Sequence, residues 1–403
     1  MDWMVLRSGR SGVVGPFEVP AELATLPSTT TTGLGLTETA KKASGGRFRD
    51  MDLARAVILV SGVYFHAAFL YSMRESWYLS SSYKAGVYDS LIAFVRTFRM
   101  DALFIVSGFF SAMLVTRSGS KGFVVNRFVR MGVPLLFCGL TLNTAMIYLT
   151  DDPWKPGWSL LDYVMGGQWR AHLWNVGNLL AYEAVVFSVL WFRPGIHKRL
   201  ASSRLVPWLA IPGYVAVAMT AVRIWAWAPE APWLRVLLHP KQMAMYVAAY
   251  LLGYAIHQNQ RLRDTLFRPS LTGTAFVFLY LLRKWIGVHT GLSDSPLVEA
   301  LDLLQHLDRA LLLFGMVRLL QSDSVWVKRI SLASYSIYIL HLPLQIAMFR
   351  FVDARFPNLL GFAIVGTVSL AVSWAIHVFL VERVPALGFL VNGKVFRPET
   401  RSF

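Results

Sequence analysis

The feature that most constrains this chain is a series of apolar runs, each about 17 to 25 residues long, separated by short polar loops. A helix that rises about 1.5 Å per residue needs a run of that length to cross the hydrocarbon of a bilayer. Hydrophobic residues make up 55% of the 403 positions, more than is usual in a globular domain. We therefore predict an all-α integral membrane protein, a bundle of about ten transmembrane helices at 53–72, 90–115, 132–150, 173–192, 206–227, 241–257, 270–288, 298–320, 331–352 and 360–381.

The charge pattern predicts how these spans are oriented. The formal net charge of +16 would suit a nucleic-acid ligand, but the basic residues are scattered among the loops instead of gathered on one soluble domain. An excess of Lys and Arg in cytoplasmic loops is the simpler explanation, so we expect a lipid bilayer and no nucleic acid as partner. The loops after spans two, four, six and eight are richest in these residues and are expected in the cytoplasm, as are both termini, because the number of spans is even.

The chain divides into three regions. Residues 1–48 lack hydrophobic periodicity and contain a Ser/Thr run, which predicts a disordered cytoplasmic tail, with a mistaken translation start as the alternative. Residues 49–385 form the membrane domain, and residues 386–403 a cytoplasmic C-terminal tail. The single cysteine, Cys138, excludes a disulfide or a cysteine metal cluster within one monomer.

Arg55 and His66 lie eleven positions apart in the first span. Eleven residues make three helical turns plus about 20°, so both side chains share one helix face, about 16 Å apart along the axis. We expect Arg55 at the cytoplasmic mouth and His66 deeper, where an imidazole can take a proton from a hydroxyl. A hydrogen-bonded structural histidine is equally compatible with this spacing.

The second span carries Arg96, Arg99 and Asp101, which cannot all face lipid. Either Arg99 and Asp101 form a neutralised polar network, or Arg99 helps to bind an anion beside His66. A guanidinium that snorkels from the helix end is the third interpretation, and it suits Arg96 best.

Two short motifs follow. Ser107 and Gly108 are small residues that let another helix or an extended ligand approach closely, although packing alone explains most such pairs. Arg127 and Arg130 stand three apart on a helical turn, so they would point the same way and could clamp a phosphate-bearing ligand from the cytosol. Ordinary positive-inside anchoring is the alternative.

Polar residues recur in later spans. His172 and Glu183 are eleven positions apart at the start and middle of the fourth span, which predicts a similar helix face. A carboxyl at that depth marks a function or a buried partner. His341 in the ninth span has either a structural or a functional role. Weaker candidates are His306, Asp308, Arg309 and His377.

No residues have the spacing of a zinc site, a phosphate-cradling glycine loop or a nucleophile elbow, so we expect no metal and no covalent serine mechanism. A buried histidine with arginines toward the cytoplasm instead suggests a base that serves an anionic, nucleotide-bearing donor from inside.

Several of these residues form a series that resembles the acyltransferase-3 family of membrane-bound O-acyltransferases. Its parts are Asp52-Leu53-Ala54-Arg55 with His66 at the matching interval, the segment 104–110, Arg127-Phe128-Val129-Arg130, His172-Leu173-Trp174, the segment 336–341 and Glu382-Arg383-Val384-Pro385. Each part is weak alone, but their order over residues 49–385 identifies the family. The closest likeness is to the glucans biosynthesis protein C branch, through the segment 65–72, Trp77 and the segment 97–100.

The resemblance implies an enzyme of the bacterial inner membrane that moves succinyl groups from a cytoplasmic donor to hydroxyls of osmoregulated periplasmic glucans. Succinyl-CoA would be the co-substrate, with no permanently bound cofactor, and the glucan biosynthesis machinery a partner. His66 would be catalytic with Arg55 as its motif partner, and Arg127 and Arg130 would contribute to the donor site. A separate hypothesis, which does not come from the resemblance, is that Arg99 holds either the oxyanion or the succinyl carboxylate.

Two departures from the pattern stand out. Ala56 follows Arg55 where the family often has glycine, and Asp101 is not shared with the branch, which puts a catalytic role for Asp101 in doubt. The nearest alternative function is O-acetylation of a surface polysaccharide or lipid-linked sugar. A transporter or flippase is an alternative of another class, although no internal repeat of the kind that builds many transporters is seen.

Overall fold

The computed structural model describes residues 48–75, 78–150, 159–227, 234–289, 295–320 and 324–394, and within these ranges every regular element is a helix. Eight segments of the described chain are long and apolar enough to cross a membrane. They are Arg49–Phe69, Gly86–Gly119, Lys121–Ile147, Leu160–Phe192, Val206–Trp225, Pro269–His289, Val325–Asp353 and Leu359–Val381. The predicted all-α integral membrane bundle is confirmed. The predicted tail over 1–48 lies outside the described residues except for Phe48.

The two other predicted spans are also helices, although they are less apolar. They form α12 (Pro240–Gln258) and α15 (Pro296–Leu320), 19 and 25 residues long. Helices of that length are long enough to cross about 30 Å of hydrocarbon. α15 buries Gln305 and Asp308 inside the protein, as a helix with such groups must do in a bilayer.

The remaining elements follow in chain order. They are α2 (Arg49–Phe69), α3 (Gly86–Arg96), α4 (Arg99–Arg127), η2 (Phe128–Gly132), α5 (Val133–Cys138), η3 (Gly139–Asn143), α6 (Thr144–Ile147), α7 (Leu160–Met165), η4 (Gln168–Leu173), α8 (Trp174–Phe192), α9 (Ile196–Ser202), α10 (Val206–Trp227), α11 (Leu234–Leu237), α13 (Gln260–Leu266), α14 (Pro269–His289), α16 (Val325–Asp353), α17 (Leu359–Ile376), η5 (His377–Val381) and α18 (Pro385–Asn392).

Several predicted spans depart from the continuous α-helix that was expected. The second is divided between α3 and α4 at Thr97 and Phe98. The third begins at the last residue of the π-helical segment η2 and contains a second π-helical segment, η3, after α5. Before the fourth, Ala171 inside the 3₁₀-helical segment η4 has a φ of 42°. The chain turns at this residue, and α8 begins at Trp174. Irregular backbone at membrane depth is tolerated where protein or a cavity surrounds it.

Glycines bring the backbones of α4 and α12 into contact. A Cβ on Gly108 would lie 2.0 Å from the carbonyl oxygen of Tyr250, and one on Gly253 would lie 2.0 Å from that of Ile105. Each helix therefore needs a residue without a side chain where the other crosses it.

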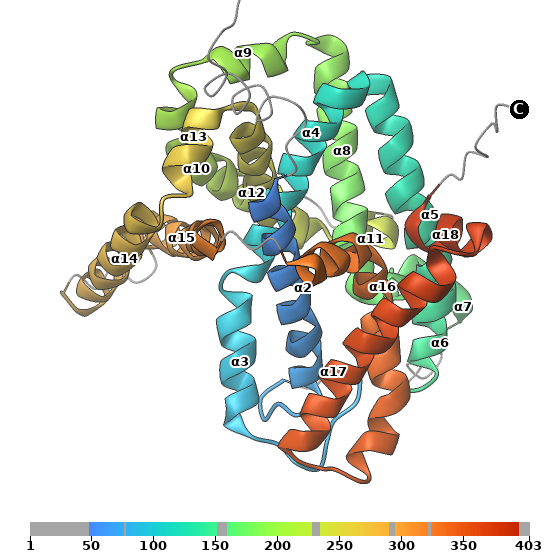
Figure 1. Cartoon of the computed structure of the whole chain (residues 1–403). Coiled ribbons are helices and arrows are strands. Elements are labelled where there is room, and N and C mark those ends of the chain that lie inside the picture. The colour runs from blue at the N-terminus through green and yellow to red at the C-terminus, as the bar shows by residue number, and fades with distance from the viewer. Residues whose placement is uncertain are drawn as a thin grey trace, which may run out of the picture. The chain divides into compact units, whose positions relative to one another are not determined.

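Polar bonds join α2 to α16, beside which it packs in Figure 1. The Ser331 hydroxyl donates to Asp52 Oδ1 at 2.9 Å. Arg55 Nη2 donates to Ser334 Oγ at 3.0 Å. These bonds fix the rotation of α2, the helix that carries His66.

The segment predicted as the C-terminal tail begins with α18, which packs against α5. Gly393 has a φ of 57°, and a Cβ there would lie 2.4 Å from the Cα of Arg130. At Asn392, the last residue of α18, the side-chain Oδ1 accepts a hydrogen bond from Ser336 of α16 at 2.9 Å. The first residues after 385 thus belong to the folded unit.

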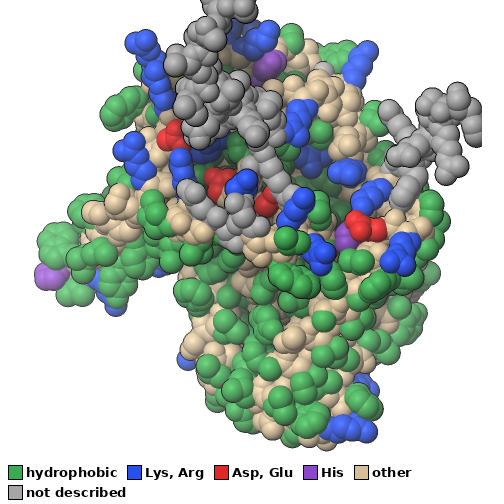
Figure 2. Space-filling model, in the orientation of Figure 1, with side chains coloured by type: hydrophobic (Ala, Val, Ile, Leu, Met, Phe, Trp, Pro, Cys, Tyr) green, Lys and Arg blue, Asp and Glu red, His purple; other side chains and the backbone are tan. Residues whose placement is uncertain are grey.

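The visible surface separates basic from apolar regions. Figure 2 shows Lys and Arg side chains gathered over the upper part, where α9 and α13 lie in Figure 1, and hydrophobic side chains over the lower part. On α14, Phe278 and Trp285 expose 62% and 55% of their surface. Large apolar side chains exposed in this number suit contact with lipid.

Candidate active site

Three histidines from distant parts of the chain meet inside the bundle. His66 lies on α2, His172 on η4 and His341 on α16. The ring centroids of His66 and His341 are 5.2 Å apart, those of His172 and His341 5.3 Å, and those of His66 and His172 6.3 Å. All three side chains are buried. Each was a separate candidate in the sequence, and the structure joins them into one histidine cluster.

Hydrogen bonds fix two of these rings. His172 Nε2 lies 3.0 Å from the carbonyl oxygen of Tyr338, and the Tyr338 hydroxyl is bonded to the carbonyl oxygen of His172 and to Asn175 Oδ1. His341 Nδ1 lies 3.0 Å from a carbonyl oxygen one turn earlier in α16. Because a carbonyl only accepts, these two nitrogens carry the ring protons. In the neutral rings, His172 Nδ1 and His341 Nε2 are acceptors, and neither has a hydrogen-bond partner among the described residues.

Arg99, the first residue of α4, adds a positive charge beside the histidine cluster. Its Cζ lies 4.4 Å from the ring centroid of Phe65, and that ring contacts His66 edge-on at 5.3 Å. Its Nη1 lies where a Cβ on Gly62 would be only 2.8 Å away. Within the described part of the chain, no carboxylate forms an ion pair with Arg99.

A cavity of about 1000 Å³ opens onto this cluster. His66, Arg99, His172 and Tyr338 form one part of its wall. The rest comes largely from the ends of α10, α12 and α15 and includes flat aromatic faces and carboxylates. Among these are Trp174, Trp225, Tyr246, Glu75, Asp101 and Glu299. Aromatic faces with a few placed polar groups suit a ligand that has both apolar faces and hydroxyls.

Asp101 lines the cavity but does not neutralise Arg99. The Tyr214 hydroxyl donates to Asp101 Oδ1 at 3.2 Å. His306 Nδ1 lies 3.2 Å from the carbonyl oxygen of Thr97, so it satisfies a group that the break between α3 and α4 leaves without a helical partner. Of the alternatives for the second span, the shared Arg99–Asp101 network is wrong, and a cation beside His66 matches the geometry.

Arg96 is the last residue of α3, and its guanidinium is exposed, as expected of an arginine that snorkels from a helix end. Its Nη1 and Nη2 donate to the two carboxylate oxygens of Glu75 at 2.9 and 2.8 Å. The two side chains expose 52% and 42% of their surface. A pair this exposed contributes little to stability.

A second buried cluster, the inner cluster, joins α4 to α8. Arg127 Nε lies 3.5 Å from Glu183 Oε1, and Arg127 Nη2 donates to Ser111 Oγ at 3.2 Å. Ser111 in turn donates to Glu183 at 2.5 Å. The prediction that His172 and Glu183 share a helix face is wrong. Glu183 lies in α8, which begins at Trp174, whereas His172 lies in the preceding segment η4, next to the turn at Ala171.

Arg127 and Arg130 do not form a matched pair. α4 ends at Arg127, and Arg130 lies in the π-helical segment η2, where α-helical spacing no longer holds. Arg127 is held by Glu183, whereas Arg130 is exposed. A donor-binding role for each stays a prediction.

Arg55 faces the same helix as the catalytic candidate, as their spacing predicts. It bonds Ser334 of α16, and His66 contacts His341 of α16. Gly108 meets the backbone of α12, so packing accounts for the glycine. A donor-binding role for Ser107 and Gly108 stays a prediction.

Of the four weaker candidates, His306 lines the cavity, and the other three lie elsewhere. His377 Nδ1 is 2.8 Å from Ser336 Oγ, on the side of α16 that faces η5 and α18. Asp308 and Arg309 lie on α15, and Arg309 donates to Gln305 of the same helix at 3.3 Å. None of these side chains lines the cavity.

Several residues of the site were not predicted from the sequence, among them Gly62, Asn175, Tyr214 and Tyr246. Gly62 stands one turn before His66, and Asn175 directly follows the segment 172–174, so position gave a signal for both. Tyr214 and Tyr246 lie in apolar runs where nothing distinguishes a hydroxyl that faces a cavity from one that faces lipid.

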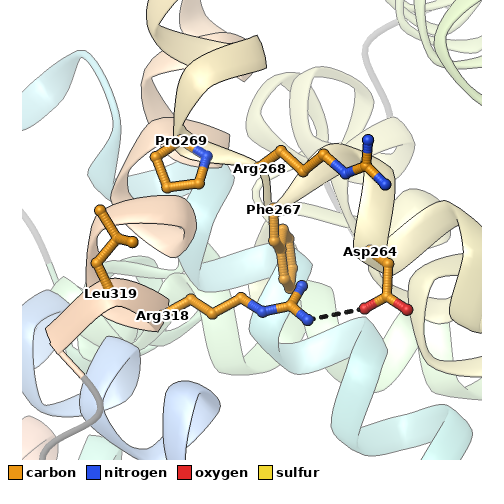
Figure 3. A pocket seen from close by; sticks show the side chains of 6 residues that line it. All are labelled: Asp264, Phe267, Arg268, Pro269, Arg318 and Leu319. Carbon is orange, nitrogen blue, oxygen red and sulfur yellow. Dashed lines mark hydrogen bonds and ion pairs between the residues drawn. The ribbon is translucent and has the colours of Figure 1, made fainter.

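A smaller pocket of about 500 Å³ lies between the α13–α14 turn and the end of α15 (Figure 3). Arg318 donates to Asp264 across it at 2.9 Å, and Phe267 lies behind the pair. Arg268, expected in a cytoplasmic loop, also lines this pocket, and Figure 3 draws no bond between it and the ion pair. The pocket contains none of the candidate catalytic residues, so we do not assign it the chemistry.

Comparison with known protein families identifies the family of this chain. The acyltransferase domain of the acyltransferase-3 family matches residues 48–378, which is most of the chain. The chain belongs to the acyltransferase-3 family. The matched region of this acyltransferase contains the whole histidine cluster, Arg99 and the inner cluster.

Curated relatives named glucans biosynthesis protein C are similar over most of their length. The protein from Salmonella typhimurium is 26% identical over 384 residues, which covers 85% of this chain and 94% of the relative. The protein from Escherichia coli O81 is 25% identical over 373 residues, with the same shares covered. No solved structure matches the chain. Family and fold together make this chain a membrane acyltransferase.

Proposed function

We propose that this acyltransferase moves succinyl groups from succinyl-CoA, a cytoplasmic co-substrate, to hydroxyls of osmoregulated periplasmic glucans at the bacterial inner membrane. The observation that carries the proposal is the cluster of His66, His172 and His341, in which His66 and His172 line one large cavity together with Arg99. The relatives' name, glucans biosynthesis protein C, supports the acceptor class.

The connectivity supports a cavity that opens toward the periplasm. Its wall includes the C-terminal end of α10 and the N-terminal ends of α12 and α15, which alternating spans bring to the same side of the membrane. The basic helices α9 and α13 follow the opposite ends of the spans. By the positive-inside rule the basic side is cytoplasmic, which leaves the cavity outside and both termini inside.

The reaction needs one base and one acid, and His66 can serve as both in turn. It takes the proton from an acceptor hydroxyl while the oxygen attacks the thioester carbonyl carbon. A C–O ester bond forms, the C–S bond breaks, and the departing CoA thiolate receives the proton from His66. The acceptor nitrogens of His172 and His341 keep polar groups beside the imidazolium that forms.

The donor would approach from the cytoplasmic side. Arg130 is exposed and can meet the phosphates of CoA, whereas Arg127 is less exposed and paired with Glu183. Arg55 lies on the same face of α2 as His66 and about three turns nearer the helix start, along the direction that the pantetheine arm would follow.

The test is a deletion strain complemented with single variants, with periplasmic glycans analysed by mass spectrometry. His66→Ala is expected to abolish succinylation at an unchanged protein level. His289→Ala is the matched control, because that histidine is exposed at the end of α14. Acetyl in place of succinyl on the glycans would favour the alternative acyl donor. Succinylation retained by His66→Ala would contradict the mechanism.

A further inference from the structure

We propose that Arg99 binds the free carboxylate of the acyl group during transfer and thereby selects a dicarboxylic donor of the succinyl class over acetyl. The inference rests on the proposed acyl transfer at His66. It assigns to the site a specificity that neither the family nor the relatives' name states.

The first argument is that the positive charge of Arg99 has no carboxylate partner among the described residues. Other arginines of the described chain have carboxylate partners, among them Arg96 with Glu75 and Arg127 with Glu183. Arg99 has none among the described residues, and its Nε is buried without a hydrogen-bond partner there. A guanidinium donates in a planar fork that matches a carboxylate.

The second argument is that Arg99 does not serve the helix it begins. The N-terminal end of a helix carries partial positive charge, which favours anions and disfavours a cation. Asp101 stands in the same first turn, yet its carboxylate is bonded to Tyr214. Local stability therefore gives no reason for the guanidinium at this position.

The third argument is distance along α2. Gly62 stands one turn before His66, and one turn is about 5.4 Å. Because Arg99 Nη1 occupies the space beside Gly62, the guanidinium lies about one turn from the imidazole. In a succinyl thioester, two methylene groups separate the reacting carbonyl from the carboxylate, which is a separation of the same scale. The Phe65 ring supports the guanidinium face at 4.4 Å and holds it in place.

The experiment measures transfer by the purified full-length protein in lipid nanodiscs, with a glucan acceptor and either succinyl-CoA or acetyl-CoA. We expect wild type to prefer succinyl-CoA. In Arg99→Gln, kcat/KM for succinyl-CoA should fall at least about tenfold through KM, and the succinyl-to-acetyl ratio should fall with it. Arg99→Lys should recover part of the ratio, because it keeps the charge but not the fork.

A second variant moves the guanidinium without removing it. Gly62→Ala adds a methyl 2.8 Å from Arg99 Nη1, the far end of a flexible side chain, so the protein should fold and the ratio should fall less than in Arg99→Gln. Gly273→Ala is the control, because no atom lies within 4 Å of the added methyl, and it should keep the wild-type ratio.

The outcomes separate this inference from the proposed function. An equal loss with both donors in Arg99→Gln would assign Arg99 to the oxyanion and overturn the inference alone. Wild type that transfers acetyl but not succinyl, or transfers neither, would overturn the succinyl proposal and the inference together.

Discussion

The two buried polar clusters of this bundle are built in opposite ways. In the inner cluster, Arg127 meets Glu183 directly, and Ser111 bonds both. In the histidine cluster, Arg99 lies beside imidazoles and an aromatic ring, and no described carboxylate pairs with it. In the inner cluster the arginine is paired with a carboxylate, whereas in the histidine cluster Arg99 has no described carboxylate partner and lines a cavity together with His66 and His172.

The difference between the two clusters shows when a buried charge indicates function. A charge inside a membrane bundle is costly in either case, but a neutralised network needs only its own members. A network that lacks its counter-charge is complete only when a ligand supplies one. The comparison therefore predicts that damage to the inner cluster affects folding, whereas damage to the histidine cluster affects transfer.

The largest effect is expected from His66→Asn. Loss of the base should lower kcat at least about 100-fold, the usual range for general acid–base catalysis. The melting temperature in nanodiscs should change little, because asparagine keeps a polar side chain in the cavity wall. A fall in melting temperature that parallels the loss of activity would break the comparison.

Glu183→Ala should act on stability instead. It leaves Arg127 without its carboxylate, at a cost of about 2 to 3 kcal/mol, below the full value for a buried pair because Arg127 is 19% exposed. Thermal unfolding measures this cost. The double variant Glu183→Ala, Arg127→Ala should recover part of the loss. A normal melting temperature with a raised KM for the CoA donor would instead assign the pair to donor binding.

Gly108→Ala sharpens the same distinction. The new methyl would overlap the Tyr250 carbonyl oxygen, so α4 and α12 must separate, at a cost of about 1 to 3 kcal/mol. The melting temperature should fall, and transfer from succinyl-CoA and acetyl-CoA should fall in parallel. A rise in donor KM without a change in melting temperature would return Gly108 to the donor site that the sequence predicted.

The smallest effect is expected from Glu75→Gln. It removes the partner of Arg96 in an exposed pair, so the free energy of unfolding should change by less than about 1 kcal/mol. Thermal unfolding in low and high salt checks this. A larger loss at both salt concentrations would show that the cavity wall depends on the pair.

The sequence predicted the helices and several residues of the candidate site, because polar residues stand out in apolar runs. Arg99, His66, His172 and His341 were all visible in this way. Their meeting was not, because His172 and His341 are brought together by α16 and by the turn at Ala171, whose positive φ no local pattern announces.

Two other errors have a similar origin. The spacing of Arg127 and Arg130 assumes a continuous α-helix, and the π-helical segment η2 removes that assumption. The choice of partner for Asp101 depended on Tyr214, more than 100 positions away on α10. Periodicity describes one helix at a time, whereas charge pairing depends on how helices pack.

The most direct test of the account uses sealed proteoliposomes that enclose a glucan acceptor, with labelled succinyl-CoA added only at the basic face, which we propose to be cytoplasmic. The account predicts that succinyl ester accumulates on the enclosed glucan with wild-type protein and not with His66→Ala, while CoA stays outside. Enclosed glucan that remains unmodified, or ester formation that does not need His66, would contradict it.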